Sequence, residues 1–512
     1  MTPITEPQAE PPAPAPAPAA NDAPQRSLTK TIFRNSMVVT GGGGIVRLLG
    51  FAYTIFVVRH LGDDAYGHLA IISSFVGLFS VFFELGTSQY VERSVAQDRS
   101  RLPQLLWTLI VVRFTLAIAG IILLTGLATL FHYEQVVVLG ILLFTLTFIF
   151  SSVQVAFQTI LSSHERYDLW TAVLIIGQLA TMALGTFVLL QGGGVLALVA
   201  VGPIAMVLQI ACTIAATRSL KLGALPFRFD VREVLPFLRA CLPFGLTSLA
   251  LTITMNVDTF ILGLLQPSNV VGWYSAAYRL VPTIVSLLGG FLTVITPSLA
   301  RLYISDPEAV RTWTRGSLKW LAMFGLPAAV GISLLAAKII GLFYGADFGP
   351  AAPVLALIAW DIPLRLFNAF AGNVTAAVGL ERPAWRIYMT GAVLGIVLYI
   401  PAILFFGIMG AAAITVLTDG INSVLLMRLL SRHMQADQLL PILLRIFLTA
   451  IAMGVVVFLV NPHLPLPVTV LAGVLVYGTA ARILGLIDDA TLNRGRNWLG
   501  RRLGRRLVRR GA

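Results

Sequence analysis

The sequence predicts an all-α, polytopic membrane protein of about 14 transmembrane helices. Of its 512 residues, 57% are hydrophobic and only 12% are charged, and the mean hydropathy is +0.86. An average soluble domain is about 25% charged, so this chain has too few charges to cover its apolar surface in water. From Asn35 onward, apolar stretches of about 20 residues follow one another, each long enough to cross a hydrocarbon core about 30 Å thick. A soluble enzyme is excluded.

Residues 1–30 precede the first span and are rich in proline and alanine. They lack hydrophobic periodicity, and they lack the basic start and apolar core of a signal peptide. We expect a disordered cytoplasmic tail here.

The apolar stretches must be helical, because lipid offers no partner to backbone groups. The alternating segments of about ten residues that are typical of a membrane β-barrel do not occur in the sequence. We expect an N-lobe of six spans at 31–217, a cytoplasmic linker at 218–237 and a C-lobe of six spans at 238–432. Spans 13 and 14, at 433–487, and a basic cytoplasmic tail at 488–512 follow. The expected spans are 35–58, 68–91, 104–131, 136–161, 169–190, 195–217, 238–265, 273–300, 317–337, 351–378, 385–406, 410–430, 440–460 and 467–487.

The distribution of lysine and arginine predicts the orientation of the chain. With the N-terminus inside, 29 of the 36 lysines and arginines lie in or beside the segments that face the cytoplasm. Only Arg59 and Lys338 lie in outside loops, and five arginines fall within the spans. This bias follows the positive-inside rule. We therefore expect both termini in the cytoplasm and the chain in the cytoplasmic (inner) membrane of a bacterium.

The net charge of +13 is thus mostly a mark of topology and not of nucleic-acid binding. Nine of the 29 cytoplasmic cations belong to the C-terminal end, where RNWLGRRLGRRLVRR has the outline of a basic amphipathic helix. We expect this run to lie on the anionic headgroups of the inner leaflet.

A short internal repeat supports the division into two lobes. The segment FVVRHLGDDAYGHLA (56–70) leaves the first span, and FILGLLQPSNVVGWYSAA (260–277) leaves the seventh. Each passes from an apolar exit through a polar turn to a glycine that opens the next helix, at Gly67 and Gly272. Parallel repeats related by an axis along the membrane normal are common in secondary transporters.

Four arginines within the spans are candidates for binding an anionic headgroup. Arg47 lies near the centre of span 1, just after the glycines at 41–44, and Arg365 lies near the middle of span 10. Arg113 and Arg279 lie closer to span ends, from which an arginine can reach the interface. A charge at this depth is costly and is by default a functional hypothesis, and the guanidinium group matches phosphate geometry.

Four acids within the spans are candidates for ion coupling or gating: Glu84, Asp258, Asp361 and Asp419. The alternative is that they only neutralise the arginines. Asp361 and Arg365 are spaced i, i+4 on one helix and can satisfy each other. For Asp258, which follows Asn256 closely, a gating or folding role is as good an interpretation as ion coupling.

The remaining polar residues carry weaker signals. Glutamines in spans 4 to 6 can line a path for sugars or form interhelical hydrogen bonds, which is the commoner use. The two cysteines have neither disulfide nor metal-site spacing, and no zinc-protease motif, P-loop or nucleophile elbow occurs. We therefore expect no resident cofactor, no metal site and no catalytic residues. The residues in question are Gln154, Gln158, Gln178, Gln209, Cys212 and Cys241.

Several motifs, in this order, resemble the polysaccharide-transport branch of the multidrug/oligosaccharidyl-lipid/polysaccharide exporter superfamily, which includes O-antigen and exopolysaccharide flippases. They are LGDDAYG (61–67), ELG (84–86), VDTFILG (257–263), VGWYSAAYRL (271–280), LFYGADFGPAAPVL (342–355) and GIMGAAAITVLT (407–418). The resemblance implies two six-helix lobes around a V-shaped central cavity and two further C-terminal helices. It also implies alternating access that turns a polyprenyl-pyrophosphate-linked oligosaccharide from the inner to the outer leaflet, with possible proton or sodium coupling.

On this resemblance we expect a flippase for O-antigen, exopolysaccharide or capsule biosynthesis, and not an enzyme. Its partners would be the lipid-linked oligosaccharide and membrane lipids, with a polysaccharide polymerase and glycosyltransferases as further candidates, but no nucleic acid. A same-fold exporter of lipid II or of drugs is the alternative, although a cationic drug would favour an acidic cavity. A membrane-embedded polymerase or glycosyltransferase is a third interpretation, and it usually needs a larger outside loop than any in this sequence.

Overall fold

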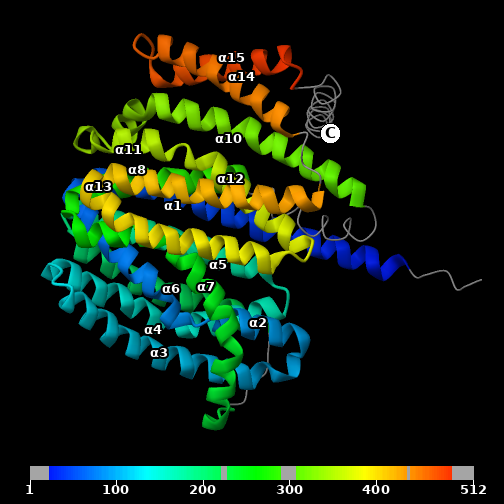
Figure 1. The fold of residues 1–512 in the computed structure, drawn as a ribbon. Coiled ribbons are helices and arrows are strands. Elements are labelled where there is room, and N and C mark those ends of the chain that lie inside the picture. The colour runs from blue at the N-terminus through cyan, green and yellow to red at the C-terminus, as the bar shows by residue number, and fades with distance from the viewer. Residues whose placement is uncertain (1–21, 221–227, 290–306, 435–438, 487–512) are drawn as a thin grey trace, which may run out of the picture.

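The computed structural model describes residues 22–220, 228–289, 307–434 and 439–486, and within these ranges the chain is helical and contains no strand. The long helices run roughly side by side across the view of Figure 1. They are α1 (Asp22–Glu84), α2 (Thr87–Gln97), α3 (Leu102–Leu130), α4 (Gln135–Ser163), α5 (Tyr167–Leu190), α6 (Val195–Arg218), α7 (Val231–Leu265), α8 (Ser268–Gly289), α10 (Pro307–Phe343), α11 (Ala351–Ile358), α12 (Asp361–Ala377), α13 (Glu381–Met434), α14 (Leu439–Val460) and α15 (Leu466–Ile483), with 3-10 turns η1 (Arg99–Arg101) and η2 (Ala346–Phe348).

Two of these elements each consist of two helices that meet at a glycine. In α1 the junction is Gly62, with φ 76° and ψ 179°, and in α13 it is Gly407, with φ 56° and ψ −138°. Only glycine takes up such backbone angles at little cost. A methyl group on Gly410 would lie 2.0 Å from the carbonyl oxygen of Ala402, so the second arm of α13 folds back against the first.

Ten helical stretches of the described chain are long and apolar enough to cross a membrane. Two of them, Gly41–Gln97 and Glu381–Arg432, contain these glycine junctions, and each covers two of the spans expected from the sequence. The protein is therefore an all-α, multi-pass membrane protein. The number of fourteen crossings stays a prediction.

The expected span at 68–91 is broken at Leu85 and Gly86, between α1 and α2. Three further differences in helix boundaries bear on the architecture. Helix α1 begins at Asp22, so residues 22–30, expected in the disordered tail, are helical, and 1–21 lie outside the described residues. Helix α7 begins at Val231, where the Asp230 side chain caps its N-terminus by accepting from the Arg232 amide at 2.8 Å. The linker is correspondingly shorter than predicted.

The third difference is a break in the expected span at 351–378. It consists of α11 and α12, and the chain between them turns at Ala359 and Trp360. The length of the apolar stretch does not reveal this break, since hydrophobic residues continue on both sides of it. Its consequence is that Asp361 stands in the first turn of α12, where a carboxylate is favoured by the helix dipole. The C-terminal basic tail, 488–512, lies outside the described residues.

The two lobes share one hydrophobic core. It runs from Phe75 in α1 through Tyr274 in α8 and Phe348 in η2 to Phe370 in α12, all nearly completely buried. In Figure 1, α3, α4 and α6 lie on one side of α1, and α10, α14 and α15 lie on the other. Because α1 and α8 pack within the same core, the two lobes meet along these helices.

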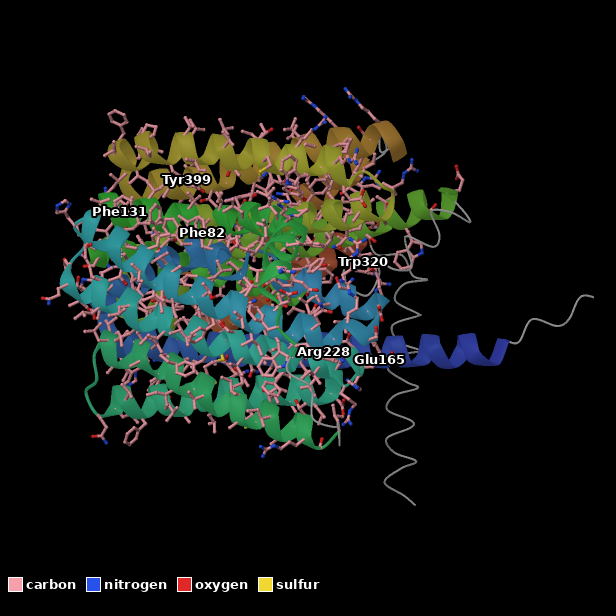
Figure 2. All side chains as sticks on the ribbon, turned by 90° about the horizontal axis from the view of Figure 1, so that it is seen from below. Phe82, Phe131, Glu165, Arg228, Trp320 and Tyr399 are labelled. Atoms are coloured by element: carbon pink, nitrogen blue, oxygen red, sulfur yellow. The ribbon has the colours of Figure 1, made fainter. Side chains whose placement is uncertain are left out.

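The loops after α3 and α4 lie at opposite ends of the bundle, as expected if the helices cross it from end to end. Phe131, after α3, lies at one end, and Glu165, after α4, lies at the other (Figure 2). We call the end with Phe131 the outer end, following the predicted orientation. The described chain begins and ends at the inner end (Figure 1).

The two basic residues predicted outside both bind the carbonyl groups at helix ends. Arg59 donates from Nε to the Phe343 carbonyl oxygen at 2.7 Å and also binds the Leu342 carbonyl, at the end of α10. Lys338 donates to the carbonyl oxygens of Asn461 and Leu464, the latter at 2.8 Å, and so holds the α14–α15 turn against α10. Cations are stabilising at helix C-termini because the carbonyl groups there lack partners.

Candidate functional site: a cavity between the lobes

A cavity of about 450 Å³ lies where the two lobes meet. Its walls come from both arms of α1 and from α4, α5, α6, α7 and α8. Most of the lining is apolar or carries neutral hydroxyl and amide groups, and no aspartate or glutamate lines it among the described residues. The polar lining residues are Tyr53, Thr54, Tyr66, Ser73, Ser74, Thr147, Gln178, Thr181, Asn256, Thr259, Ser275, Tyr278 and Arg279.

Arg279 is the one charged side chain in the described lining of this cavity. It lies on α8, is exposed to the cavity, and has no hydrogen-bond or ion-pair partner within the described chain. Arg47 is also exposed and lies outside the lining. It stands three residues before Gly50 and seven before Thr54, both of which line the cavity, so helical periodicity puts all three on one face of α1. Arg47 therefore lies between the cavity and the inner end.

Close to the cavity lining, the two repeats make a direct contact. A methyl group on Gly67 would lie 1.7 Å from the Ser268 carbonyl oxygen, and one on Gly272 would lie 2.2 Å from the carbonyl oxygen of Asp63. The Trp273 indole donates to the Asp63 carboxylate at 3.1 Å. The equivalent glycines of the repeat thus allow two backbones to touch. We call this the outer contact, made of Asp63, Asp64, Gly67, Ser268, Gly272 and Trp273.

Arg365 does not line the cavity but lies in an acidic cluster behind its wall. Its Nε atom is hydrogen-bonded to Asp361 and lies 3.2 Å from an Asp419 oxygen, and its Nη2 donates to the Tyr278 hydroxyl at 3.0 Å. The guanidinium carbon lies 5.3 Å from the centre of the Tyr278 ring. The pairing of Arg365 with Asp361 predicted from their spacing is confirmed. Asp419 is a second partner, which spacing alone could not reveal.

Asp258 belongs to the same region of the C-lobe. It is 2% exposed and accepts a hydrogen bond from the Tyr274 hydroxyl at 2.7 Å and one from the Thr259 amide at 2.6 Å. Tyr274 stacks on Tyr278, with ring centres 5.8 Å apart. Thr259 and Tyr278 also line the cavity, so the acidic cluster and the cavity share a wall.

The cluster has more negative than positive groups. Asp258, Asp361 and Asp419 stand against a single guanidinium, that of Arg365. One oxygen of Asp361 is buried without any hydrogen-bond partner in the described chain. Buried charges need partners, and this oxygen has none within the described chain.

Arg113 and Glu84 form a separate pair in the N-lobe. Arg113 is 2% exposed, its Nη2 lies 3.5 Å from the Glu84 carboxylate, and its Nη1 donates to the Ser88 hydroxyl at 2.9 Å. Leu85 and Gly86, where α1 gives way to α2, both have positive φ. Arg113 thus holds a helix break in place, and it is directed away from the cavity lining.

Of the glutamines singled out in the sequence, Gln178 lines the cavity and three others do not. Gln154 is buried and exchanges hydrogen bonds with Thr213 at 2.9 and 3.1 Å, which is the interhelical use that was the alternative interpretation. Sequence reasoning missed Tyr53, Ser275 and Tyr278. Their tyrosine and serine types are common in any span, so only their position on the cavity wall distinguishes them.

The described chain is thus a two-lobed, all-α membrane protein with a polar cavity between its lobes. Comparison with known families makes this more specific: the chain belongs to the polysaccharide biosynthesis protein family, whose model matches residues 32–303. A second family model, MatE, matches residues 243–400. The superfamily expected from the motifs is thereby confirmed.

Two curated relatives come from the archaeon Haloferax volcanii. The probable flippase AglR is 28% identical over 233 residues, which is 43% of this chain and 48% of that protein. The probable low-salt glycan biosynthesis flippase Agl15 is 26% identical over 170 residues, 33% of this chain and 36% of that protein. The matched region thus spans less than half the length of either relative.

Solved structures share the fold over almost their whole length. The lipid II flippase MurJ in an inward closed conformation has a TM-score of 0.73 at 17% identity, covering 87% of this chain and 98% of that one. An inward-facing multidrug resistance MATE transporter has a TM-score of 0.63 at 17% identity, covering 77% and 99%. At this identity the likeness establishes the fold alone.

Proposed function

We propose that the protein turns polyprenyl-pyrophosphate-linked oligosaccharides across the cytoplasmic (inner) membrane, by alternating access, for surface polysaccharide biosynthesis. The observation that carries the proposal is the cavity between the lobes, whose single described charge is the unpaired Arg279. An anionic pyrophosphate and a hydrated glycan cannot enter hydrocarbon unaided. A cavity with one free cation and a neutral hydrogen-bonding lining suits both parts of such a headgroup, and no lining carboxylate favours a cationic drug.

The apolar part of the substrate needs a site of its own. A groove of about 1,270 Å³ lies between α10, α12, the second arm of α13 and α14, with an almost wholly apolar lining. Leu321, Phe367, Leu417 and Phe447 line it, and Arg428 stands at its inner end. This groove suits a polyprenyl chain that stays in the bilayer while the headgroup crosses.

The acidic cluster suits ion coupling. It has three carboxylates to one guanidinium and shares Tyr278 and Thr259 with the cavity wall. Binding of a proton or a sodium ion at Asp361 would change the charge that Tyr278 and Arg365 face. Only a ligand that binds the two states of the transporter differently can bias their equilibrium, and this cluster offers such a difference.

The test is a comparison of variants in a strain that lacks the protein. We expect wild-type protein and the control Gln209→Leu, which changes a residue outside the lining, to restore surface glycan. Arg279→Gln should not restore it at equal protein abundance, and lipid-linked repeat units should accumulate. Normal glycan with Arg279→Gln would refute the headgroup site, and accumulation of lipid II in the empty strain would transfer the proposal to that substrate.

Coupling is tested separately with reconstituted protein. Flipping of a labelled lipid-linked oligosaccharide should respond to an imposed proton or sodium gradient, and Asp361→Asn should remove the response. Flipping that is indifferent to both gradients would refute the coupling role of the cluster.

A further inference from the structure

Six polar side chains of the cavity wall make no hydrogen bond or ion pair within the described chain. They are Tyr53, Tyr66, Thr147, Gln178, Ser275 and Arg279. The phenol oxygen of Tyr53 and the hydroxyl of Ser275 are buried, and a buried polar group without a partner costs about 1–3 kcal/mol. Gln178 is half-buried and Arg279 is exposed, so both side chains can bind a ligand that enters the cavity.

Other hydrogen-bonding residues of the lining differ from these six. Thr54, Thr181 and Asn256 each donate to the carbonyl oxygen four residues earlier in the same helix, at 2.9, 2.9 and 3.0 Å. The two threonine hydroxyl protons are therefore already used, as is one of the two N–H groups of the Asn256 amide.

On the N-lobe wall, Gln178 and Tyr53 are brought together by two glycines. The ring of Tyr53 approaches α5 so closely that a methyl group on Gly185 would lie 1.7 Å from its hydroxyl. The Gln178 amide nitrogen lies 3.7 Å from where a methyl group on Gly50 would be. Gln178 and Gly185 are seven residues apart on one face of α5, or about 10 Å along its axis. The amide and the phenol thus stand along one strip of wall.

On the C-lobe wall, Ser275 and Arg279 are spaced i, i+4 and share a face of α8. The positive charge is therefore on the C-lobe side, and the neutral groups of Gln178 and Tyr53 are on the N-lobe side. An amide both donates and accepts hydrogen bonds, as a phenol does. Such groups match sugar hydroxyl and acetamido groups, whereas the guanidinium matches phosphate.

We infer that the cavity is divided between the lobes, so that Arg279 on the C-lobe holds the phosphates while Gln178 and Tyr53 on the N-lobe form a subsite for the first sugar. This inference rests on the proposed function. The volume of about 450 Å³ falls within the range of about 300–1,000 Å³ usual for small-ligand pockets. Because no described carboxylate lines the cavity, the subsite recognises its sugar by hydrogen bonds and shape and does not repel an acidic sugar by charge.

The test compares binding of soluble probes with and without the sugar to the purified full-length protein. The probes are citronellyl pyrophosphate and citronellyl pyrophosphates carrying N-acetylglucosamine, glucose or galactose. We expect at least one sugar probe to bind the wild type more tightly than the bare pyrophosphate. Gln178→Leu should remove that gain, by about fivefold to tenfold for one hydrogen bond, and should leave binding of citronellyl pyrophosphate unchanged. The matched control Gln209→Leu should bind all probes as the wild type does.

Each other outcome overturns the inference. If no sugar improves binding, or if Gln178→Leu keeps the full gain, the free groups serve only to hold water. If Gln178→Leu weakens every probe equally while its size-exclusion profile and thermal unfolding match the wild type, the glutamine belongs to the phosphate site and the division between lobes is wrong. If the wild type binds none of the probes, the proposed function itself fails, which distinguishes that failure from the loss of the sugar subsite alone.

Discussion

Replacing Gly67 with alanine should shift the protein away from the conformation in which the outer contact is closed. The added methyl group would lie 1.7 Å from the Ser268 carbonyl oxygen and 2.4 Å from its carbon, whereas real methyl carbons essentially never come closer than 3.0 Å to such atoms. The obstacle is backbone and not a flexible side chain. The two helix starts must therefore move apart by more than about 1 Å, which also weakens the hydrogen bond between Trp273 and Asp63.

Overpacking of this kind costs about 1–3 kcal/mol. The cost falls only on the state with the outer contact closed, so the ratio of outer-open to outer-closed molecules should rise by roughly 5-fold to 150-fold. Gly341→Ala is the matched control, because a methyl group there would meet no atom within 4 Å although the residue is also near the outer end.

The shift can be measured as a distance between spin labels at the outer end. Cysteines at Gln191 in the N-lobe loop and Phe406 in the C-lobe are both exposed and lie outside the outer contact. We expect Gly67→Ala to enlarge the population with the longer distance and to slow transport, and Gly341→Ala to change neither. An unchanged distance distribution in Gly67→Ala, with the protein correctly folded, would refute the role assigned to the glycine pair.

Two further predictions concern the buried charges. Arg365→Gln should lower the free energy of unfolding by about 3–5 kcal/mol, since it leaves two adjacent buried acids without their cation. Adding Asp361→Asn should recover part of this loss in a thermal unfolding assay. Equal melting temperatures for the wild type and the two variants would contradict this. Arg113→Met should lower the free energy of unfolding by about 1.5–3 kcal/mol, because charged hydrogen bonds at the start of α2 are lost. The folded variant should still bind citronellyl pyrophosphate. Selective loss of that binding would place Arg113 in the headgroup site instead.

Much of the fold can be predicted from the sequence, because helix positions and loop sides depend on local sequence patterns. Apolar length predicts most of the long helices, the lysine and arginine bias predicts which loops share an end, and the repeat predicts that Gly67 and Gly272 are equivalent. Their contact across the lobes was not predicted, since backbone approach between distant segments leaves no mark in either segment alone. Gly62 and Gly407 likewise carry no signal that separates a helix junction from an ordinary glycine.

The site was predicted less completely, for a physical reason. The position of an arginine within a span identifies a costly charge. The position of a residue along a span does not show in which direction its side chain points. Arg113 and Arg365 turn toward carboxylates of their own lobes, whereas Arg279 turns into the cavity, and this difference depends on partners that lie 29 to 54 residues away or belong to other helices.

The hydrogen bonds of Arg59 and Lys338 to backbone carbonyl groups bear on the direction of the proposed transport. These are the only two of the 36 lysines and arginines predicted outside, and within the described chain both are bonded to backbone carbonyl groups. On the proposed function, a pyrophosphate headgroup would approach from the predicted cytoplasmic side, which is rich in cations. At the predicted outer side it would meet two cations whose hydrogen-bond donors already bind carbonyl groups, so we expect release there to be favoured over return.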